Sequence, residues 1–430
     1  MKTVAFHTLG CKVNQYDTQA MLEKFRQAGY EVVPFDAAAD VYVINTCTVT
    51  GTGDKKSLQL TRRLRREHPE SHIILAGCLA QRKGAELLDT GARLIIGTQH
   101  RDQVVELLEQ SIVGGPLSAV NELNAATPFE ELTITTQDEH TRATLKIQEG
   151  CNNHCTYCII PSVRGPIRSR AISNIREETQ RLVEAGYTEL VLTGIHLSSY
   201  GKDLGDGSTL LDAVRAVHEV EGVQRIRLGS LEPTIATVAF SQTLAAMPKV
   251  CPQFHLALQS GSNTVLARMA RRYNMTMYMQ AVDNLRAAFP MAAFTTDVLT
   301  CFPGETEEEY EETRQTIQAV GYAKIHVFPY SPREGTKAAV MPGQLSKAVK
   351  ERRTRELIAL GDETAAAYQA QWVGRESTVL IEEKIGGRWH GYTPEYIPVR
   401  IADCPACVPG RIVIVRLTAS AAEGMTGEII

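Results

Sequence analysis

The sequence predicts an α/β protein in three parts: an N-terminal open parallel α/β sheet, a central partial (β/α)6 barrel, and a small all-β barrel at the C-terminus. A chain of 430 residues is too long for one core, since single cores stop growing near about 250–300 residues. Strand-like apolar runs alternate with helical patterns in two separate series, which is typical of β/α units. We therefore divide the chain into residues 1–115, a linker over 116–142, residues 143–368 and residues 369–430.

The first series predicts the N-terminal sheet. Its strand-like runs are VAFHTLGC (4–11), DVYVINTC (40–47), HIILAGC (72–78) and RLIIG (93–97). Residues 14–28 carry apolar side chains at helical spacing, and Gly29 is placed to end that helix. From residue 116 to 142 the pattern lapses, and prolines with a polar tract indicate a linker.

The second series predicts a partial barrel, because it has six β/α units where a closed barrel has eight. Its runs are TLKIQ (144–148), ELVLTG (189–194), RIRLGS (225–230), FHLALQ (254–259), FTTDVLTC (294–301) and AKIHVFPY (323–330). Thr306 and Glu309 predict a capping box on a helix that Gly321 ends. From about residue 372, STVLIEE, a Gly386–Gly387 turn, RWHGYT, IPVRI and RIVIVRL indicate a small β-barrel.

The composition argues against several classes of protein. Hydrophobic residues make up 43% and charged residues 22% of the chain, as in a folded protein with a buried core. No apolar run approaches the roughly 20 residues of a membrane helix, and His7 interrupts the start before a signal-peptide core could form. We expect a cytoplasmic protein with no membrane partner. The net charge of −4 gives no general attraction to nucleic acid, so such a partner would need local basic patches.

Three cysteines close together predict an iron–sulfur site. Cys151, Cys155 and Cys158 form C-x3-C-x2-C directly after the first strand of the second series. Three thiolates can bind three irons of a 4Fe–4S cluster, whereas a cluster that only carries electrons normally takes four cysteines. One iron would then stay open for a chelating ligand. The alternatives are chance and a zinc site that includes His154, although structural zinc takes four ligands.

Three further cysteines predict a second metal site. Cys11, Cys47 and Cys78 are far apart in sequence, but each ends a strand-like run of the first series. Parallel strands bring their C-terminal ends to one edge of the sheet, where ligand sites form. The alternative is three small buried residues, since free cysteine is among the most buried residue types. Three such positions in register favour a second cluster with an open iron.

These features resemble a known family. C-x3-C-x2-C after the first barrel strand, with Tyr157 before the last cysteine, resembles the radical S-adenosylmethionine (SAM) enzymes. In those enzymes the amino and carboxylate groups of SAM bind the open iron, and reductive cleavage of SAM gives a 5′-deoxyadenosyl radical. With its second cysteine set, the whole chain resembles the radical-SAM methylthiotransferases, through TLGCKVNQYDT, NTCTVT, AGCLAQ, EGCNNHCTYCIIPSVRGPIRSR, TGIHLSSYG, LALQSGS and FPGETEEE. The C-terminal barrel is similar to the TRAM module, an RNA-binding domain of that family.

The resemblance implies a reaction. TLGCKVNQYD and GIHLSSYG are closest to the branch that acts on N6-threonylcarbamoyladenosine at position 37 of tRNA. The expected reaction is methylthiolation of C2 of that nucleoside, with two 4Fe–4S clusters and two SAM molecules per turnover. The expected partners are a tRNA with an adenosine 3′ of the anticodon and an electron donor such as flavodoxin or ferredoxin. The alternatives are another tRNA adenosine or a ribosomal-protein Asp as substrate, and, in another class, a non-catalytic RNA-binding metalloprotein.

Several residues lie at or just beyond barrel strand ends, the face where barrel active sites are built. The resemblance implies contact with SAM there, and the candidates are Tyr157, Gly194, Ser230, Glu232 and Gln259. The alternatives are turn geometry for Gly194 and ordinary hydrogen bonding for the others.

Two basic groups are candidates for tRNA contact. Arg164, Arg168 and Arg170 follow the second cysteine loop, and we expect them to contact phosphates. A second group follows Cys47, where the alternative is a solvated helix face; its members are Lys55, Lys56, Arg62, Arg63, Arg65 and Arg66.

Four cysteines lie outside the two sets, and Cys251 among them is expected to be structural. Cys301 stands where the family has a glycine, and a third ligand set around it is not expected. Cys404 and Cys407 form C-x2-C without a second pair, so they lack the ligands of a closed zinc site, and we expect a weak thiol pair or plain packing.

Overall fold

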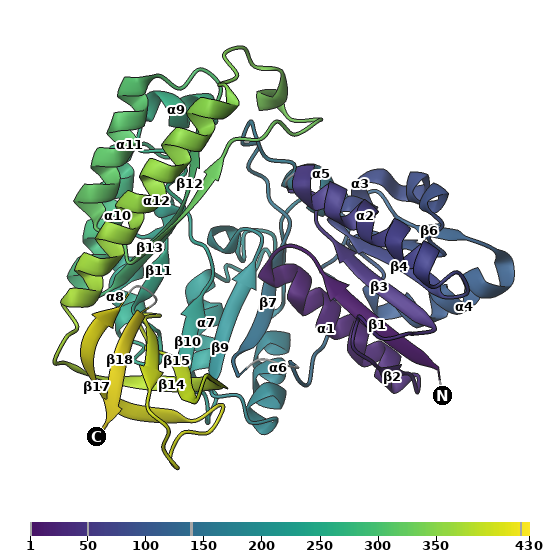
Figure 1. The fold of residues 1–430 in the computed structure, drawn as a ribbon, viewed down its shortest axis with the longest axis horizontal. Coiled ribbons are helices and arrows are strands. Elements are labelled where there is room, and N and C mark those ends of the chain that lie inside the picture. The colour runs from purple at the N-terminus through teal and green to yellow at the C-terminus, as the bar shows by residue number, and fades with distance from the viewer. Residues whose placement is uncertain (1, 50, 138–140, 422–423) are drawn as a thin grey trace.

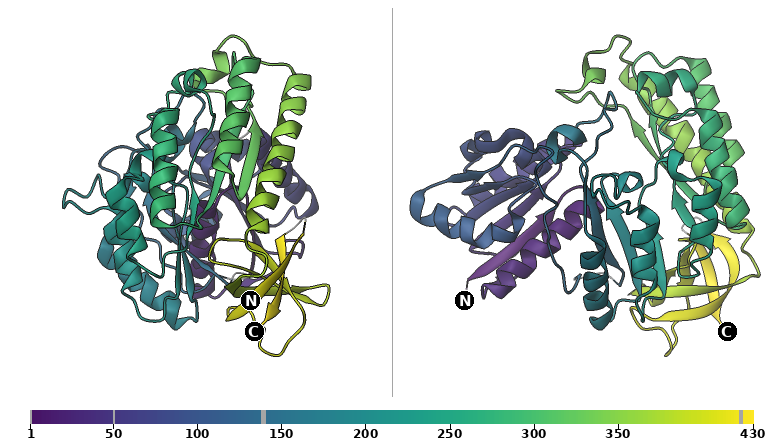
Figure 2. Two further views of the ribbon diagram at one scale, coloured as in Figure 1. Left: turned by 90° about the vertical axis from the view of Figure 1, so that its left-hand side faces the viewer. Right: turned by 180° about the vertical axis from the view of Figure 1, so that it is seen from behind.

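The computed structural model describes residues 2–49, 51–137, 141–421 and 424–430, and it has the three predicted parts (Figure 1). The N-terminal part and the small C-terminal barrel both lie against the central barrel (Figure 2). Of the predicted linker, residues 138–140 lie outside the described residues. Among the described helices, none has both the length and the apolar content needed to cross a membrane.

The N-terminal part is a six-stranded parallel sheet in the order β2-β1-β3-β4-β5-β6. Its strands are β1 (Thr3–Thr8), β2 (Glu31–Val32), β3 (Val41–Thr46), β4 (His72–Gly77), β5 (Leu94–Ile96) and β6 (Leu117–Ala119). Four strands match the prediction. β2 was not predicted, and β6 lies in the segment assigned to the linker. Both are edge strands of two or three residues, too short to show an apolar pattern.

Helices cover both faces of this sheet, as parallel sheets require. They are α1 (Lys12–Gln27), α2 (Gly51–Glu67), α3 (Cys78–Lys83) and α4 (Val104–Gly114), with 3-10 turns η1 (Gly84–Thr90) and η2 (Arg101–Gln103). Met21 of α1 and Leu108 of α4 pack on one face, while Leu64 of α2 and Leu79 of α3 pack on the other. The opposite side of α1 packs through Tyr16 into the core of the central barrel.

The central part is an open arc of six parallel strands, as predicted. They are β7 (Ala143–Glu149), β9 (Glu189–Gly194), β10 (Arg225–Leu228), β11 (Gln253–His255), β12 (Ala293–Thr300) and β13 (Lys324–Pro329). They form the sheets β10-β9-β7-β8 and β11-β12-β13, which the isolated bridges Ile226–Val250 and Leu231–Leu256 connect. The short β8 (Arg168–Ser169) runs antiparallel to β7 and was not predicted.

Except for the short α5 (Ile160–Arg164), which packs against α3 of the N-terminal part, the helices of this part lie along the outside of the arc (Figure 1). These helices are α6 (Ile172–Glu184), α7 (Leu210–His218), α8 (Val238–Ala245), α9 (Asn263–Arg268), α10 (Met275–Ala288), α11 (Glu307–Val320) and α12 (Lys347–Ala370), with 3-10 turns η3 (Leu197–Ser199), η4 (Pro233–Ile235) and η5 (Lys337–Val340). The predicted capping box of Thr306 and Glu309 starts α11, and Gly321 ends it in the left-handed conformation at φ +63°.

The C-terminal part is a closed barrel in the order β14-β15-β16-β18-β17. Its strands are β14 (Glu376–Ile385), β15 (Arg388–Tyr392), β16 (Pro398–Ile401), β17 (Ile412–Ala421) and β18 (Gly424–Ile429). Gly386 and Gly387 form the predicted turn with φ of +57° and +78°. β18 was not predicted, because GMTGEI has too few apolar residues for a strand pattern.

Two arginines of β10 attach the small barrel to the N-terminal ends of the central strands. Arg225 donates to the carbonyl oxygens of Tyr392 and Thr378 at 3.0 and 2.9 Å, and Arg227 donates to that of Pro394 at 2.9 Å. Both side chains also bind Glu189, at 3.3 and 2.9 Å, so these buried charges are compensated. The opposite, C-terminal ends of the strands stay available for a site.

Candidate functional site

The fold gathers the first cysteine set at one edge of the N-terminal sheet. Cys11 follows β1, Cys47 follows β3 and Cys78 follows β4, and these three strands are neighbours. Gly10 lets two of the turns approach, since a Cβ there would lie 3.2 Å from Cys47 Sγ. The thiol of Cys78 interacts electrostatically with both Cys11 and Cys47. The predicted convergence of the three positions is therefore present.

Burial sets the protonation of these thiols. It raises the pKa of Cys78 to about 11, against the opposing effect of the Arg164 guanidinium, and it also raises the pKa of Cys47. Without a ligand, both groups hold their protons near neutral pH. Binding of iron must displace those protons, because metals take the thiolate form of cysteine.

The second cysteine set lies on the loop between β7 and α5. Cys151 accepts a hydrogen bond from the backbone N–H of Asn153 at 3.3 Å, and Cys155 accepts one from Arg271 Nη1 at 3.3 Å. Burial raises the pKa of Cys158 to about 12, and the neighbouring Cys155 and Cys151 raise it further. All six cysteines of the two sets are free thiols, so a disulfide does not account for either group.

The residue types of both sets fit an iron–sulfur cluster. Across the described ranges, no three His, Cys, Asp or Glu side chains converge closely enough to hold one metal ion. His154, the fourth ligand of the zinc alternative, is exposed. Three thiolates are the donors that a 4Fe–4S cluster with one open iron takes, so the donor chemistry of each set fits such a cluster.

The structure brings some of the predicted SAM residues to the second set. Tyr157, in the cysteine loop, donates to Gln259 Oε1 at 3.1 Å. Glu232 is buried beside the same loop. Gly194 has a packing explanation, because a Cβ there would lie 2.8 Å from Gln148 Cβ. Ser230 is exposed, and no bond joins it to the cysteine loop in the described part of the chain.

Sequence reasoning missed three residues that surround Glu232. Asn153 Nδ2 donates to Glu232 Oε1 at 3.3 Å, Arg271 Nη2 pairs with the same oxygen at 3.2 Å, and His196 Nε2 lies 3.1 Å from Oε2. Although burial opposes it, the His196 hydrogen bond and the Arg271 charge lower the pKa of Glu232. His196 lies inside the TGIHLSSYG motif, which is a usable signal, whereas the sequence around Arg271 carries none.

The expectation of phosphate contact by Arg164, Arg168 and Arg170 is wrong in this structure. All three side chains are buried, with at most 3% of each residue exposed. Arg164 pairs with Glu149 at 2.8 Å and with Asp17 at 3.1 Å. Arg170 pairs with Glu131 and Glu178. The polar texture of PSVRGPIRSR reflects a charged interface between two parts of the chain, and not an RNA-binding surface.

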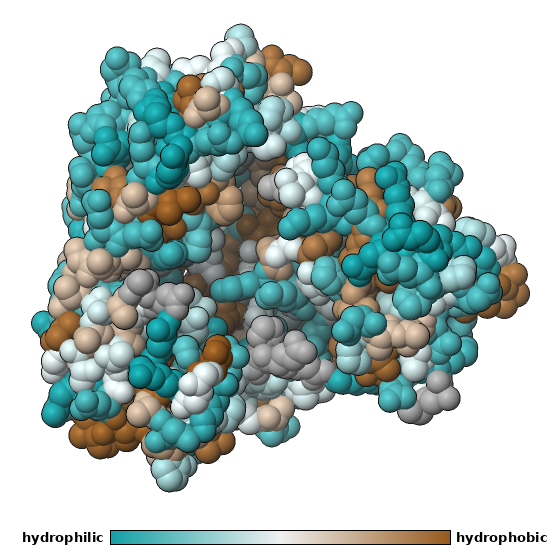
Figure 3. All heavy atoms as spheres, in the orientation of Figure 1, coloured by the Kyte–Doolittle hydropathy of each residue, from teal (hydrophilic) through white to brown (hydrophobic). Residues whose placement is uncertain are grey.

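The other basic group is exposed. All six side chains lie on α2, immediately after Cys47, and they form the basic face of α2: Lys55, Lys56, Arg62, Arg63, Arg65 and Arg66. Figure 3 shows the hydrophilic surface over this helix, and it also shows the molecule hollowed between the N-terminal part and the central barrel.

A polar cluster lines the inner face of the arc below the second cysteine set. Phe254, Val298 and Ile325 pack outward against the helices, so the alternating residues of these strands face inward. The inward cluster comprises His255 on β11, Asp297 on β12 and His326 on β13. His255 Nε2 lies 3.6 Å from Asp297 Oδ2, and the two imidazole rings are stacked at 6.5 Å.

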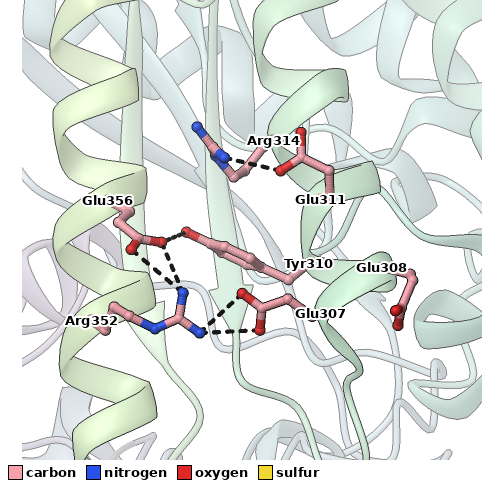
Figure 4. Close-up of a pocket in the computed structure, with 7 residues that line it drawn as sticks. All are labelled: Glu307, Glu308, Tyr310, Glu311, Arg314, Arg352 and Glu356. Carbon is pink, nitrogen blue, oxygen red and sulfur yellow. Dashed lines mark hydrogen bonds and ion pairs between the residues drawn. The ribbon is translucent and has the colours of Figure 1, made fainter.

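A surface hollow between α11 and α12 is unrelated to the cysteines (Figure 4). Its lining is charged: Glu307, Glu308, Tyr310, Glu311, Arg314, Arg352 and Glu356. Arg352 pairs with Glu307 at 3.0 Å and Arg314 pairs with Glu311 at 2.9 Å. These charges satisfy one another, so the hollow offers little to a ligand.

Comparisons with known proteins agree with this geometry. Residues 3–97 match the family described as uncharacterized protein family UPF0004, and residues 145–317 match the radical SAM superfamily. Among solved structures, the radical SAM methyltransferase TsrM from Kitasatospora setae superposes with a TM-score of 0.57 at 13% identity, over 79% of this chain and 77% of that one. The chain is thus a radical SAM enzyme in fold and in cysteine motif.

Curated relatives identify the family to which the chain belongs within the radical SAM superfamily. The threonylcarbamoyladenosine tRNA methylthiotransferase MtaB of Bacillus subtilis is 44% identical over 93% of this chain and 90% of its own. Proteins of the same name from Thermotoga maritima and Chlamydia pneumoniae are 35% and 33% identical, over 92% and 98% of this chain and 91% and 97% of their own. The chain belongs to this MtaB family of radical SAM methylthiotransferases.

Proposed function

We propose that this enzyme methylthiolates C2 of N6-threonylcarbamoyladenosine at position 37 of tRNA, in the cytoplasm. The observation that carries the proposal is the presence of two separate sets of three cysteines beside one open barrel. The names of the full-length relatives support the tRNA substrate and the threonylcarbamoyl group. The position of the new carbon–sulfur bond follows from the family resemblance.

The two cysteine sets have different roles in the proposal. Cys151, Cys155 and Cys158 hold the cluster whose open iron binds SAM, and Cys11, Cys47 and Cys78 hold the cluster that presents sulfur. When bound, SAM and the clusters supply the radical, the sulfur and the methyl group. One SAM molecule is consumed for the radical and a second for the methyl group, and a donor such as flavodoxin or ferredoxin supplies the electrons.

The protein's own side chains hold this machinery in place. The Tyr157–Gln259 bond joins the cysteine loop to the segment after β11, and Glu232 joins Asn153 of that loop to His196 after β9. We assign Glu232, with its lowered pKa, and the Tyr157–Gln259 pair to the SAM site. Ser230 and Gly194 lie at neighbouring strand ends and complete the rim of that site.

The basic face of α2 takes the place of the buried arginines as the proposed phosphate contact. Its six side chains are exposed and begin eight residues after Cys47, so tRNA bound there lies next to the first cysteine set. Residues 369–430 resemble an RNA-binding module and supply the second contact in this proposal.

Mass spectrometry of tRNA nucleosides tests the proposed product. Deletion of the gene should remove 2-methylthio-N6-threonylcarbamoyladenosine and leave N6-threonylcarbamoyladenosine in its place. A loss of a different methylthio-adenosine, or of a methylthiolated ribosomal-protein Asp, would instead support the alternative substrates. Unchanged nucleosides and proteins would support the non-catalytic metalloprotein.

Two cysteine variants test the separate roles of the two cysteine sets. Cys155→Ala should abolish SAM cleavage, because the cluster that binds SAM loses a ligand. Cys47→Ala should retain SAM cleavage in reconstituted protein but stop sulfur insertion. Anaerobically purified wild-type protein should hold about eight irons, since each 4Fe–4S cluster takes four. Normal sulfur transfer by Cys47→Ala would contradict the proposal.

A further inference from the structure

Each cysteine set receives a hydrogen bond from one buried or nearly buried arginine. Arg271 donates to Cys155 of the second set, and Arg164 Nε donates to Cys78 Sγ of the first set at 3.2 Å. Arg164 is the more unusual of the two. It ends α5 of the central barrel, yet its guanidinium reaches a cysteine of the N-terminal sheet.

The same guanidinium is connected to the other two cysteine turns. Arg164 Nη2 donates to Asn14 Oδ1, and Asn14 Nδ2 donates to the carbonyl oxygens of Leu9 and Thr46 at 2.7 and 3.1 Å. Leu9 lies two residues before Cys11, and Thr46 lies immediately before Cys47. One side chain from another part of the chain therefore contacts or indirectly fixes all three ligand positions.

Arg164 itself is paired without the cysteine, through Asp17 and Glu149. Three buried cations, Arg101, Lys146 and Arg164, pair with the anions Asp17, Glu149 and Glu130, and the buried Arg168 is a fourth cation close to them. Lys146 pairs with Asp17 at 2.6 Å and with Glu149 at 3.3 Å. The hydrogen bond to Cys78 is an additional interaction, so it is directed at the negative charge that a ligating thiolate brings to this site.

We propose that Arg164 is a positioning residue of the N-terminal cluster site: it holds the three cysteine turns in register and stabilises the reduced cluster through its hydrogen bond to Cys78. This inference rests on the proposed assignment of Cys11, Cys47 and Cys78 as ligands. Hydrogen bonds to ligating sulfurs are among the factors that set cluster potentials. A positive donor favours the more negative, reduced state, so it raises the reduction potential.

The experiment that tests the role of Arg164 measures the N-terminal cluster alone. In a full-length background with Cys151, Cys155 and Cys158 all changed to Ala, the reconstituted protein retains only that site. Its midpoint potential is measured by EPR-monitored titration, together with its iron content. The test variants are Arg164→Gln and Arg164→Lys. The control is Arg170→Lys, which alters another buried arginine after the same loop that binds Glu178 and Glu131 and no cysteine.

Arg164→Gln should shift the one-electron equilibrium at least tenfold toward the oxidised cluster, a fall of about 59 mV in potential. Arg164→Lys keeps the charge but cannot donate to Cys78, Asn14 and Glu149 together, so the shift has the same sign and is smaller. Loss of iron by the Arg164 variants, with iron retained in Arg170→Lys, also supports the positioning role. If Arg164→Gln fails to fold, the potential and iron content of Arg164→Lys test the proposal.

Two results would overturn the inference. The first is that Arg164→Lys, and Arg164→Gln where it folds, keep the wild-type potential and iron content. Arg164 would then neither position the cysteine turns nor stabilise the reduced cluster. An equal change in Arg170→Lys would show that any buried arginine of the loop has the same effect. Cys47→Ala in the same background separates this question from the ligand assignment, because retention of four irons there would show that the assigned site is wrong.

Discussion

Gly77 shows how a single residue controls the position of a cysteine. It precedes Cys78 with φ +89°, and a Cβ there would lie 2.3 Å from Asn45 Oδ1 and 2.7 Å from the Thr46 carbonyl oxygen. We expect Gly77→Ala to displace Cys78 and to reduce the iron content from about eight to about four per chain, the content of a single 4Fe–4S cluster. Iron analysis of reconstituted protein measures this, and SAM cleavage should remain.

Gly29→Ala is the matched control for that substitution. Gly29 has a similar φ of +80°, but a Cβ there would meet no other atom within 4 Å. The change therefore carries only the left-handed backbone cost of about 1–2 kcal/mol. Gly77→Ala should lose more free energy of unfolding than Gly29→Ala, because its Cβ would also clash with Asn45 and Thr46, and only Gly77→Ala should lose iron. Equal iron contents in the two variants would refute the role of the close approach.

At the scale of elements, the inner face of β11–β13 is a candidate contact for the modified base. Asp297 is 38% exposed and its carboxylate has only the long 3.6 Å contact to His255 in the described part of the chain. Gln259 joins this face to the cysteine loop, since its N–H donates to the Asp297 carbonyl oxygen at 3.0 Å and its side chain accepts from Tyr157. A partly exposed carboxylate with only one long contact, on the inner face of a barrel, is suited to hold a polar substrate group.

We therefore expect His326→Ala to lower kcat/KM for tRNA roughly fivefold, the effect of losing one hydrogen bond of about 1 kcal/mol. Iron content and SAM cleavage without tRNA should stay unchanged, because His326 touches neither cysteine set. His218→Ala, on the outer helix α7, is the control and should leave kcat/KM unaltered. A wild-type kcat/KM in His326→Ala would exclude this face as a contact.

The elements also show what can be predicted from sequence. Strands such as β9 were predicted to the residue, because long apolar runs bounded by turn residues report burial directly. β2 and β6 were missed, since edge strands depend on a neighbour for hydrogen bonds and need little apolar surface of their own, and β18 was missed because it has too few apolar residues for a strand pattern. The strand of FHLALQ was predicted too long: β11 ends at His255, and beyond it only isolated bridges at Leu256 and Gln259 continue the pairing, with Gln259 at φ +61°.

At the scale of the whole molecule, the site lies where segments distant in sequence meet. The cysteines were predictable because each carries a local or topological signal. Arg164 was found as a residue but given the wrong role, because its partners Asp17 and Cys78 come from another part of the chain. Contacts of this kind depend on how the parts pack, and no spacing within the sequence encodes them.

The same packing directs attention to α2 as the surface that meets tRNA. Replacing Lys55, Lys56 and Arg62 together with Ala should weaken tRNA binding, because each lysine or arginine on a phosphate releases a counterion. If the phosphates are double-helical, the slope of log Kd against log salt should fall by about 0.9 for each phosphate that the variant no longer neutralises. Binding measured across a salt series checks this, with iron content as the test of correct folding.

A triple variant of the same charge on α12 provides the comparison. Lys347, Arg352 and Arg355 are exposed, and α12 lies on the opposite side of the molecule from α2 (Figure 1). Replacing these three residues with Ala removes the same net charge, so it reproduces any general electrostatic effect while sparing the proposed surface. If both variants lower the salt slope equally, the attraction is general and α2 is not the contact; if only the α2 variant does, the phosphates of the tRNA lie along the helix that begins beside Cys47.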